Sequence, residues 1–176
     1  MEEDRIELRE LEEKYAKDLI DLFNNDNVIK YTNSDKLDNY LDIERKIKNI
    51  LAYDGYNYVI IYNNLVIGVI GCILDGVENL GYGLYYMIKE KYWGKGLGNL
   101  AVKNIIDRIK IDSWVNFIFA DIVSLNKASI RIVESLGFYR YVAEDKQFCM
   151  HGLEEAVLNY RLIIGVNDSN EKNNKG

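Results

Sequence analysis

The order of apolar and polar residues at the start of the chain predicts one strand followed by two helices. Residues 6–9 alternate apolar and charged side chains, which is typical of a half-buried strand. Residues 11–23 and 37–51 repeat apolar side chains every three or four positions, so each segment predicts an amphipathic helix. The asparagine-rich residues 24–27 predict a turn that ends the first helix.

The middle of the chain has a period of two instead. Residues 56–62 alternate, Asn63-Asn64 predicts a turn, and residues 65–74 return as a second strand, which together indicate a β-hairpin. Residues 80–88 repeat the same alternation and predict a third strand.

After residue 88, helical and strand patterns alternate along the chain. The apolar stripe of residues 97–109 predicts a helix, residues 115–123 a buried strand, and residues 126–136 a short helix that ends at Gly137. Two more strands are expected at Phe138–Val142 and Ala156–Ile164. This order predicts an α/β (α+β) fold with a mixed, mostly antiparallel central sheet of about seven strands, flanked by about four helices.

Composition narrows the class of protein. The chain has 176 residues with 28 acidic and 22 basic side chains, so we expect one domain over residues 1–164 and a polar, disordered tail over residues 165–176. The net charge of −6 argues against nucleic-acid binding and suits a neutral or cationic partner. Without a run of ~20 apolar residues or a signal peptide, we expect a cytoplasmic protein that does not bind membranes.

The cysteines and the histidine offer little chemistry. Cys72 and Cys149 lie far apart and have no CxxC neighbour, so neither a disulfide nor a zinc site is expected, and no metal is assigned. We interpret both cysteines as apolar packing and His151 as a structural residue on a strand.

The glycine-rich turn Trp93-Gly94-Lys95-Gly96-Leu97-Gly98 is the most informative segment. It lies between a predicted strand and a predicted helix, so its unpaired N–H groups and the helix dipole form an anion site. The alternative is a flexible turn that only starts the helix. A P-loop is excluded because no Gly-Lys-Ser/Thr is present, and a dinucleotide fingerprint because its third glycine would fall on Asn99.

Three blocks resemble the GNAT N-acetyltransferase superfamily, and in particular its subgroup that acetylates ribosomal-protein N-termini. Trp93–Gly98 resembles the pyrophosphate motif Gln/Arg-x-x-Gly-x-Gly/Ala, with Trp93 in the first place. Residues 126–138 resemble the subgroup's Asn-x-x-Ser and Glu-Lys-x-Gly-Phe element, and residues 6–11 resemble its first strand. The likeness runs in order from about residue 5 to residue 163.

The resemblance implies an enzyme that moves the acetyl group of acetyl-CoA directly to a primary amine. Backbone groups of the strand before the turn would contact the pantetheine arm, and the turn would hold the pyrophosphate. Asn126 would reach the cofactor through its amide, or alternatively cap a helix. The cofactor-binding residues implied are Met87, Ile88, Lys89, Trp93, Gly94, Lys95, Gly96, Leu97, Gly98, Asn99, Asn126 and Ser129.

The catalytic side chains of the family are not all present. The position of the usual acid tyrosine is Val133, that of the subgroup's glutamate is Gly83, and that of the turn's proline is Glu90. Our catalytic candidates are therefore Glu78 as base, Ser129 as a donor to the thiolate, and Tyr86 as acid, with Tyr82 and Tyr85 as alternatives. Each also has an ordinary structural interpretation, as a turn, helix-surface or strand residue.

The expected acceptor is a ribosomal or other protein N-terminus, or a small amine such as a polyamine or an aminoglycoside. We expect a monomer or a homodimer. Two alternatives stay open: a non-catalytic acyl-CoA-binding sensor of the same fold, suggested by the missing acid and base, and a plain interaction domain.

Overall fold

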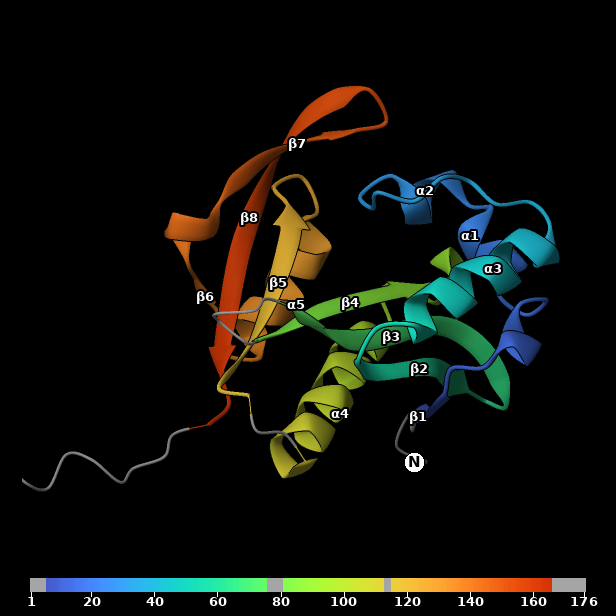
Figure 1. Ribbon diagram of the computed structural model, residues 1–176, viewed down its shortest axis with the longest axis horizontal. Coiled ribbons are helices and arrows are strands. Elements are labelled where there is room, and N and C mark those ends of the chain that lie inside the picture. The colour runs from blue at the N-terminus through green and yellow to red at the C-terminus, as the bar shows by residue number, and fades with distance from the viewer. Residues whose placement is uncertain (1–5, 76–80, 113–114, 166–176) are drawn as a thin grey trace, which may run out of the picture.

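One twisted sheet forms the centre of the protein, and helices lie on both of its faces (Figure 1). The computed structural model describes residues 6–75, 81–112 and 115–165. Within these residues the sheet has eight strands in the order β1-β2-β3-β4-β5-β8-β6, and β7 also pairs with β8. The strands are β1 (Ile6–Glu10), β2 (Gly55–Tyr62), β3 (Leu65–Asp75), β4 (Gly81–Ile88), β5 (Phe117–Val123), β6 (Tyr139–Arg140), β7 (Lys146–Met150) and β8 (Leu153–Ile163).

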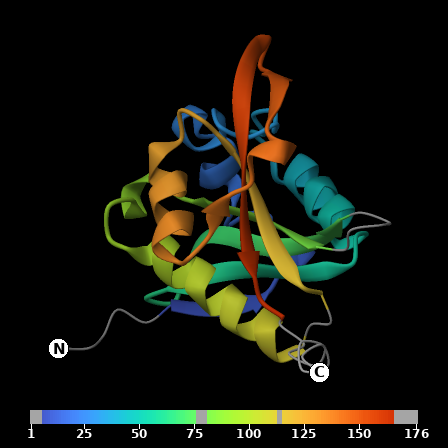
Figure 2. The same cartoon turned by 90° about the vertical axis from the view of Figure 1, so that its left-hand side faces the viewer.

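Three α-helices cover one face of the sheet and two cover the other (Figures 1 and 2). The first group is α1 (Ile20–Phe23), α2 (Asp26–Ile29) and α3 (Tyr40–Leu51), and the second is α4 (Leu97–Asp112) and α5 (Lys127–Ser135). Short 3-10 helices are present at Glu13–Tyr15, Glu90–Tyr92 and Val142–Glu144. Every strand pair is antiparallel except β4–β5, so the predicted mixed, mostly antiparallel fold is confirmed.

The predicted helix over residues 11–23 is interrupted in the structure. Leu19, Leu22 and Phe23 are buried, as the apolar stripe requires, but the backbone passes through a 3-10 helix before α1 begins. The Leu19 N–H is shared between the carbonyls of Tyr15 and Ala16, which is the geometry of a tightened turn. The predicted turn over residues 24–27 contains the start of α2, because the Asn25 side chain caps that helix by accepting from the Asn27 and Val28 N–H groups.

The C-terminal strands also differ from the prediction. The strand expected at Phe138–Val142 shortens to β6, because the chain turns into a 3-10 helix at Val142. The prediction missed β7, an edge strand whose residues 146–149 are all exposed and therefore lack an apolar alternation. Cys149 on β7 is exposed rather than packed, whereas Cys72 is buried as expected. His151 lies in the turn after β7 at φ 50°, not on a strand.

Two apolar cores pack on the two faces of the sheet. One lies between α4, α5 and the strands, with Ile105, Ile109 and Ile118 fully buried. The other lies between α1–α3 and β2–β3, with Leu19, Ile43 and Val59 fully buried. The hairpin of β2 and β3 turns at Asn63 and Asn64, both at positive φ, as predicted.

The sheet is incompletely joined at one place. β4 pairs with β3 along its whole length, but with β5 only through Tyr82–Ile118 and Gly83–Phe119. Beyond Gly83 the two parallel strands separate, and we call this gap in the ladder the split. The split leaves one edge of β4 without a strand partner in the described part of the chain.

Candidate active site

The glycine-rich turn presents a row of unpaired backbone donors. Gly94 and Gly96 adopt φ values of 73° and 75°, which residues other than glycine rarely take. In the described structure, no N–H group from Gly94 to Asn99 has a hydrogen-bond acceptor, and α4 begins at Leu97. A side chain at either glycine would meet no atom within 4 Å, so open space lies in front of both. Such a row of donors is suited to an anion, so the anion site stays a prediction with which this geometry is consistent.

Aromatic residues fix this turn where the family pattern has a proline. The Trp93 indole N–H donates to the Ile88 carbonyl at 2.7 Å, which ties the turn back to the end of β4. The Tyr92 ring stands edge-on to Tyr62 of β2, with 6.2 Å between the ring centres. The Lys95 ammonium lies 5.5 Å from the Tyr92 ring centre, beside the unpaired N–H groups. These contacts hold the turn against β2 and β4.

The remaining residues of the turn join α4 to α5. Leu97 is buried, and a side chain at Gly98 would come within 3.0 Å of Ile132 on α5. The Asn99 amide donates to the Ser135 hydroxyl at 2.8 Å, again linking the two helices. These contacts hold the first turn of α4 against α5, next to the open edge of β4.

The open edge of β4 can accept an extended ligand. The Lys89 N–H donates to the Ile67 carbonyl of β3 at 2.8 Å, whereas the Ile88 carbonyl points the other way and accepts from Trp93. Because backbone groups alternate along a strand, those of Tyr86 and Ile88 face the open edge and those of Met87 and Lys89 face β3. The Lys89 side chain is buried beside Asp21 of α1, and burial lowers the pKa of its ammonium.

Asn126 lies on the opposite side of the split, at the start of α5. Its side-chain oxygen accepts from the Ser129 N–H at 3.2 Å, so it caps α5. The structural alternative for Asn126 is therefore present in the molecule. Its side-chain amide makes no other hydrogen bond in the described residues, which leaves its donor groups available to a ligand.

Two predicted catalytic residues come together at this point. The Tyr86 hydroxyl is buried and makes no hydrogen bond of ordinary geometry with the described residues. Burial raises the pKa of the Tyr86 phenol, and the nearby Ser129 hydroxyl partly offsets that rise. A buried hydroxyl without a hydrogen bond lowers the stability of the fold, so a hydrogen-bond partner is expected for it. A ligand with a polar group near Tyr86 and Ser129 would supply that partner.

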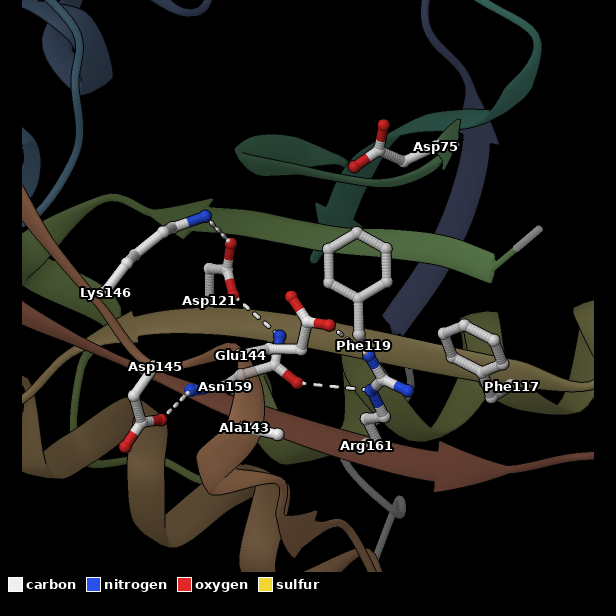
Figure 3. A pocket seen from close by; sticks show the side chains of 10 residues that line it. All are labelled: Asp75, Phe117, Phe119, Asp121, Ala143, Glu144, Asp145, Lys146, Asn159 and Arg161. Atoms are coloured by element: carbon white, nitrogen blue, oxygen red, sulfur yellow. Dashed lines mark hydrogen bonds and ion pairs between the residues drawn. The ribbon is translucent and has the colours of Figure 1, made fainter. Parts of the chain in front are cut away.

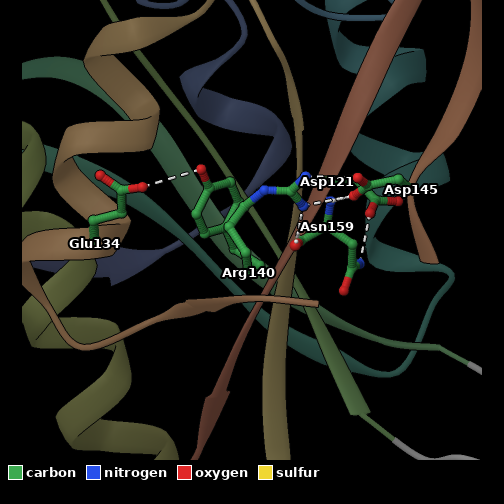
Figure 4. A network of polar contacts seen from close by, with 6 residues as sticks. Asp121, Glu134, Arg140, Asp145 and Asn159 are labelled. Carbon is green, nitrogen blue, oxygen red and sulfur yellow. Dashed lines mark hydrogen bonds and ion pairs between the residues drawn. The ribbon is translucent and has the colours of Figure 1, made fainter. Parts of the chain in front are cut away.

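Sequence reasoning missed a network of charged residues on the face of β5 and β8 turned away from α4 (Figures 3 and 4). The buried Asn159 donates to Asp121 at 2.8 Å, and the other oxygen of that carboxylate accepts from Lys146. The Arg140 guanidinium and the Asn159 N–H bind Asp145 and lower the pKa of its carboxyl to about 2. The apolar run of residues 115–123 predicted a buried strand and gave no sign of this face, apart from the single charged residue Asp121.

The charged network borders a shallow cavity of about 320 Å³. Arg161 stands within it, with its guanidinium carbon 3.6 Å from the Tyr141 ring centre and 4.8 Å from that of Phe117 (Figure 3). Asp75, Asp121 and Glu144 lie around it, so the cavity carries groups of both charges. It is separate from the glycine-rich turn, which lies at the other end of β4.

A comparison of the sequence with protein families agrees with the site. The model of the acetyltransferase (GNAT) domain matches residues 5–139. The chain belongs to the GNAT acetyltransferase family. An uncharacterized N-acetyltransferase, p20 of Bacillus licheniformis, is 27% identical over 143 residues, which span 78% of this chain and 80% of the relative.

Solved structures share the GNAT fold. A ribosomal-protein-S5-alanine acetyltransferase from Vibrio fischeri superposes with a TM-score of 0.79 at 15% identity, covering 93% of this chain and 96% of that one. A spermidine N-acetyltransferase from Vibrio cholerae, solved with CoA and spermine, gives a TM-score of 0.78 at 18% identity, covering 90% and 95%. At these identities the likeness concerns the fold.

The two positions at which GNAT members carry catalytic side chains lie in packed surroundings here. A Cβ at Gly83 would lie 3.0 Å from the Phe119 ring, so the glutamate of the resembled subgroup would require that ring to shift. Val133, in the place of the usual acid tyrosine, is fully buried in the core under α4. Glu78, the predicted base, lies outside the described residues.

The two alternative tyrosines are engaged elsewhere. The Tyr85 hydroxyl donates to the Asn57 side chain at 2.7 Å, on the face of β4 under α1–α3. Tyr82 is buried with its ring edge-on to Tyr56, at 5.4 Å between centres. Of the three tyrosines proposed as acid, Tyr86 is therefore the one whose hydroxyl is buried near Ser129 without a hydrogen bond of ordinary geometry.

The described residues contain neither a metal-binding cluster nor a membrane-spanning helix. In residues 6–75, 81–112 and 115–165, no three His, Cys, Asp or Glu side chains gather closely enough to hold a metal ion. No helix in these ranges has the length and apolar character needed to cross a bilayer.

Proposed function

We propose that this GNAT protein transfers the acetyl group of acetyl-CoA to a primary amine. The observation that carries the proposal is the row of unpaired N–H groups from Gly94 to Asn99, which faces open space at the start of α4. Several GNAT structures that resemble this one were solved with CoA or acetyl-CoA. The family membership and the unpaired donors therefore support the same ligand.

Each part of the cofactor has a matching part of the chain. The N–H groups from Gly94 to Asn99 would bind the pyrophosphate, with Lys95 beside them. The backbone groups of Tyr86 and Ile88 would pair with the pantetheine arm as an added strand would. When bound, acetyl-CoA supplies an acetyl group activated as a thioester. The Asn126 amide and the Ser129 hydroxyl would face the end of the arm from the other side of the split.

Tyr86 is the residue we propose as general acid. Its pKa is raised by burial, so the phenol keeps its proton throughout the neutral range. An acid in this place would give that proton to the departing sulfur, and the Ser129 hydroxyl would hydrogen-bond the same atom. Tyr86 would thus replace the tyrosine that other GNAT members carry at the position of the buried Val133.

The acceptor amine must be neutral when it reacts. A peptide α-amine has a pKa of about 7.7–8.0 and is partly neutral already, so water can relay its proton without a strong base. An alkyl ammonium, with a pKa of about 10.4, would need more help. The net charge of −6 supports a cationic acceptor, such as a basic protein N-terminus, a polyamine or an aminoglycoside.

Binding and turnover need separate measurements. Acetyl-CoA at 100 times its Kd should stabilise the fold by about 2.7 kcal/mol, which appears as a rise in melting temperature. Thiol release should then be followed over a panel of spermidine, an aminoglycoside and a peptide with a free N-terminus. Because Cys149 is exposed and would consume the thiol reagent, the assay should use a Cys149→Ser variant.

The outcomes separate the candidate functions. Stabilisation together with thiol release that depends on one amine supports the transferase. Tight binding without release on any amine supports the acyl-CoA sensor, which the missing family acid and base suggest. No thermal shift at all would contradict both and leave an interaction domain.

A further inference from the structure

Residues 25–32, which we call the strap, cross the split on the face opposite α4. Val28 of the strap is buried in the core under α1–α3, to which Tyr85 and Met87 of β4 also contribute. Tyr31, three residues later, packs on a small cluster from β5, β7 and β8 (Val123, Met150 and Val157). The strap therefore joins the β1–β4 half of the sheet to the β5–β8 half over the place where the two separate.

The cofactor end of the strap is anchored by Glu90. Its two carboxylate oxygens accept from the side-chain amides of Asn25 at 2.9 Å and Asn27 at 2.8 Å. Glu90 begins the 3-10 helix that leads into the glycine-rich turn and occupies the place of the family's proline. The same Asn25 caps α2, so one side chain fixes both the helix and its distance from the turn.

The far end of the strap meets the hairpin of β7 and β8. His151 lies in the turn of that hairpin, and its ring nitrogen Nε2 is 3.0 Å from the carbonyl oxygen of Thr32 on the strap. Both views place α2 and its following loop beside this hairpin (Figures 1 and 2). The strap is thus held at the glycine-rich turn, at the core and at the hairpin.

The strap lies on the face of the sheet from which an acceptor amine would approach. α4 and α5 cover the split from one face and contact each other through Gly98 and Ile132. An amine that reaches Tyr86 and Ser129 therefore approaches from the face that the strap crosses. Resting on the proposed transfer, we propose that Glu90 is a positioning residue for the acceptor: it holds the strap as a wall of the acceptor site.

Kinetics of a Glu90→Ala variant test the proposal. Losing two hydrogen bonds to a charged acceptor should raise KM for the amine about 3- to 10-fold, with kcat and the Kd of acetyl-CoA within about twofold. Asn27→Ala should raise KM in the same way, and the double variant should be no worse than the worse single variant. A general loss of stability would instead lower kcat or weaken both ligands.

Two further variants serve as controls. Lys36→Ala removes an exposed ion pair with Asp26, also on the strap, but leaves the anchor to the turn intact, so its KM should stay near that of the parent. Glu90→Gln keeps the shape of the side chain but meets two amide donors with one oxygen, so an intermediate KM is expected. Unchanged KM in Glu90→Ala, or a parallel loss of acetyl-CoA affinity, would overturn the proposal.

Hydrogen exchange separates this inference from the proposed function. In the protein without substrates, Glu90→Ala should speed amide exchange in residues 25–32 and leave residues 97–112 unchanged. If no amine is turned over but exchange responds in this way, the transfer fails and the anchoring stands. If exchange in the strap is unaffected, the positioning role is excluded whatever the turnover.

Discussion

The two halves of the sheet, β1–β4 and β5–β8, are stabilised in different ways. In β3, residues 67–72 are all buried, because α4 packs on one face and α1–α3 on the other. In β5, the residues on the α4 face are buried, whereas Phe117 and Phe119 on the other face are partly exposed and Asp121 is exposed. The other face of β5 and β8 carries the network of Asp121, Asn159 and Asp145 (Figure 4).

This difference separates the parts of the site. The proposed cofactor half depends on backbone N–H groups, on glycines at positive φ and on apolar packing, so it tolerates many changes of side chain. The face of β5 and β8 depends on charged side chains, each held by one or two partners, and a single substitution there changes its character. Within one family, we therefore expect the backbone of the first half to stay constant and the charged side chains of the second half to vary.

The largest effect is expected from a matched pair of glycine variants. Gly96 and Gly152 both lie at positive φ, 75° and 80°, with open space around them, but only Gly96 belongs to the glycine-rich turn. A glutamate at either position should lower the free energy of unfolding by a similar amount, about 1–2 kcal/mol. Only Gly96→Glu should weaken acetyl-CoA binding, by more than about 100-fold, because its carboxylate would occupy the anion site.

Calorimetric titration with acetyl-CoA and urea unfolding measure the two quantities separately. Equal loss of binding in Gly152→Glu would show that the effect is one of folding. Binding in Gly96→Glu that stays within threefold of the parent would show that the turn does not hold the pyrophosphate.

A smaller effect is expected from the neighbouring tyrosines of β4. Tyr86→Phe removes a buried hydroxyl that makes no hydrogen bond of ordinary geometry with the described residues, so the free energy of unfolding should stay the same or rise. If Tyr86 is the general acid, kcat should fall about 100-fold. Tyr85→Phe removes the bond to Asn57 instead and should lower the free energy of unfolding by about 1–3 kcal/mol.

The two tyrosine variants are expected to have opposite effects. In kinetics and urea unfolding, Tyr86→Phe should lose activity but keep its free energy of unfolding. Tyr85→Phe should lose free energy of unfolding, with a far smaller change in kcat. A Tyr86→Phe variant that retains kcat would show that Tyr86 is not the general acid.

Much of the fold could be predicted because several elements follow simple local patterns. The β2–β3 hairpin, the α4 stripe and the stop at Gly137, which takes φ 90°, all depend on local sequence. The failures lie where local pattern and tertiary contact disagree. The exposed edge strand β7 has no apolar alternation. The segment before α1 buries the apolar residues expected of a helix, but its backbone is not a continuous α-helix.

The part of the candidate site that consists of backbone N–H groups could be predicted from the sequence. The sequence of the turn sufficed to predict unpaired N–H groups, and the structure shows them from Gly94 to Asn99. The pairing of Asn25 and Asn27 with Glu90 joins residues more than sixty positions apart, so no local pattern indicates it. The same holds for Asn159 and Asp121, which meet only because β5 and β8 are neighbours.

The smallest effect concerns the charged face and its response to acid. Asp145 accepts two bonds of 2.6 Å from Arg140 and one from the Asn159 N–H, and its pKa falls from 3.8 to about 2. A depressed carboxyl pKa adds stability that is fully present above the unfolded value and is lost as the pH falls toward the folded one. Asp145→Asn should therefore be less stable than the parent at neutral pH, and the difference should shrink between about pH 4 and pH 2.

The pair formed by Arg9 and Glu7 provides the matched control. It has the same two-bonded geometry, at 2.7 and 2.8 Å, and the pKa of Glu7 is also lowered by Arg9, but both side chains are about half exposed or more. Because solvent screens such a pair, Glu7→Gln should change acid stability less than Asp145→Asn in urea unfolding followed from pH 6 downward. If the two variants respond alike, the charged face of β5 and β8 is no more than an ordinary surface, and the contrast between the halves of the sheet does not extend to their energetics.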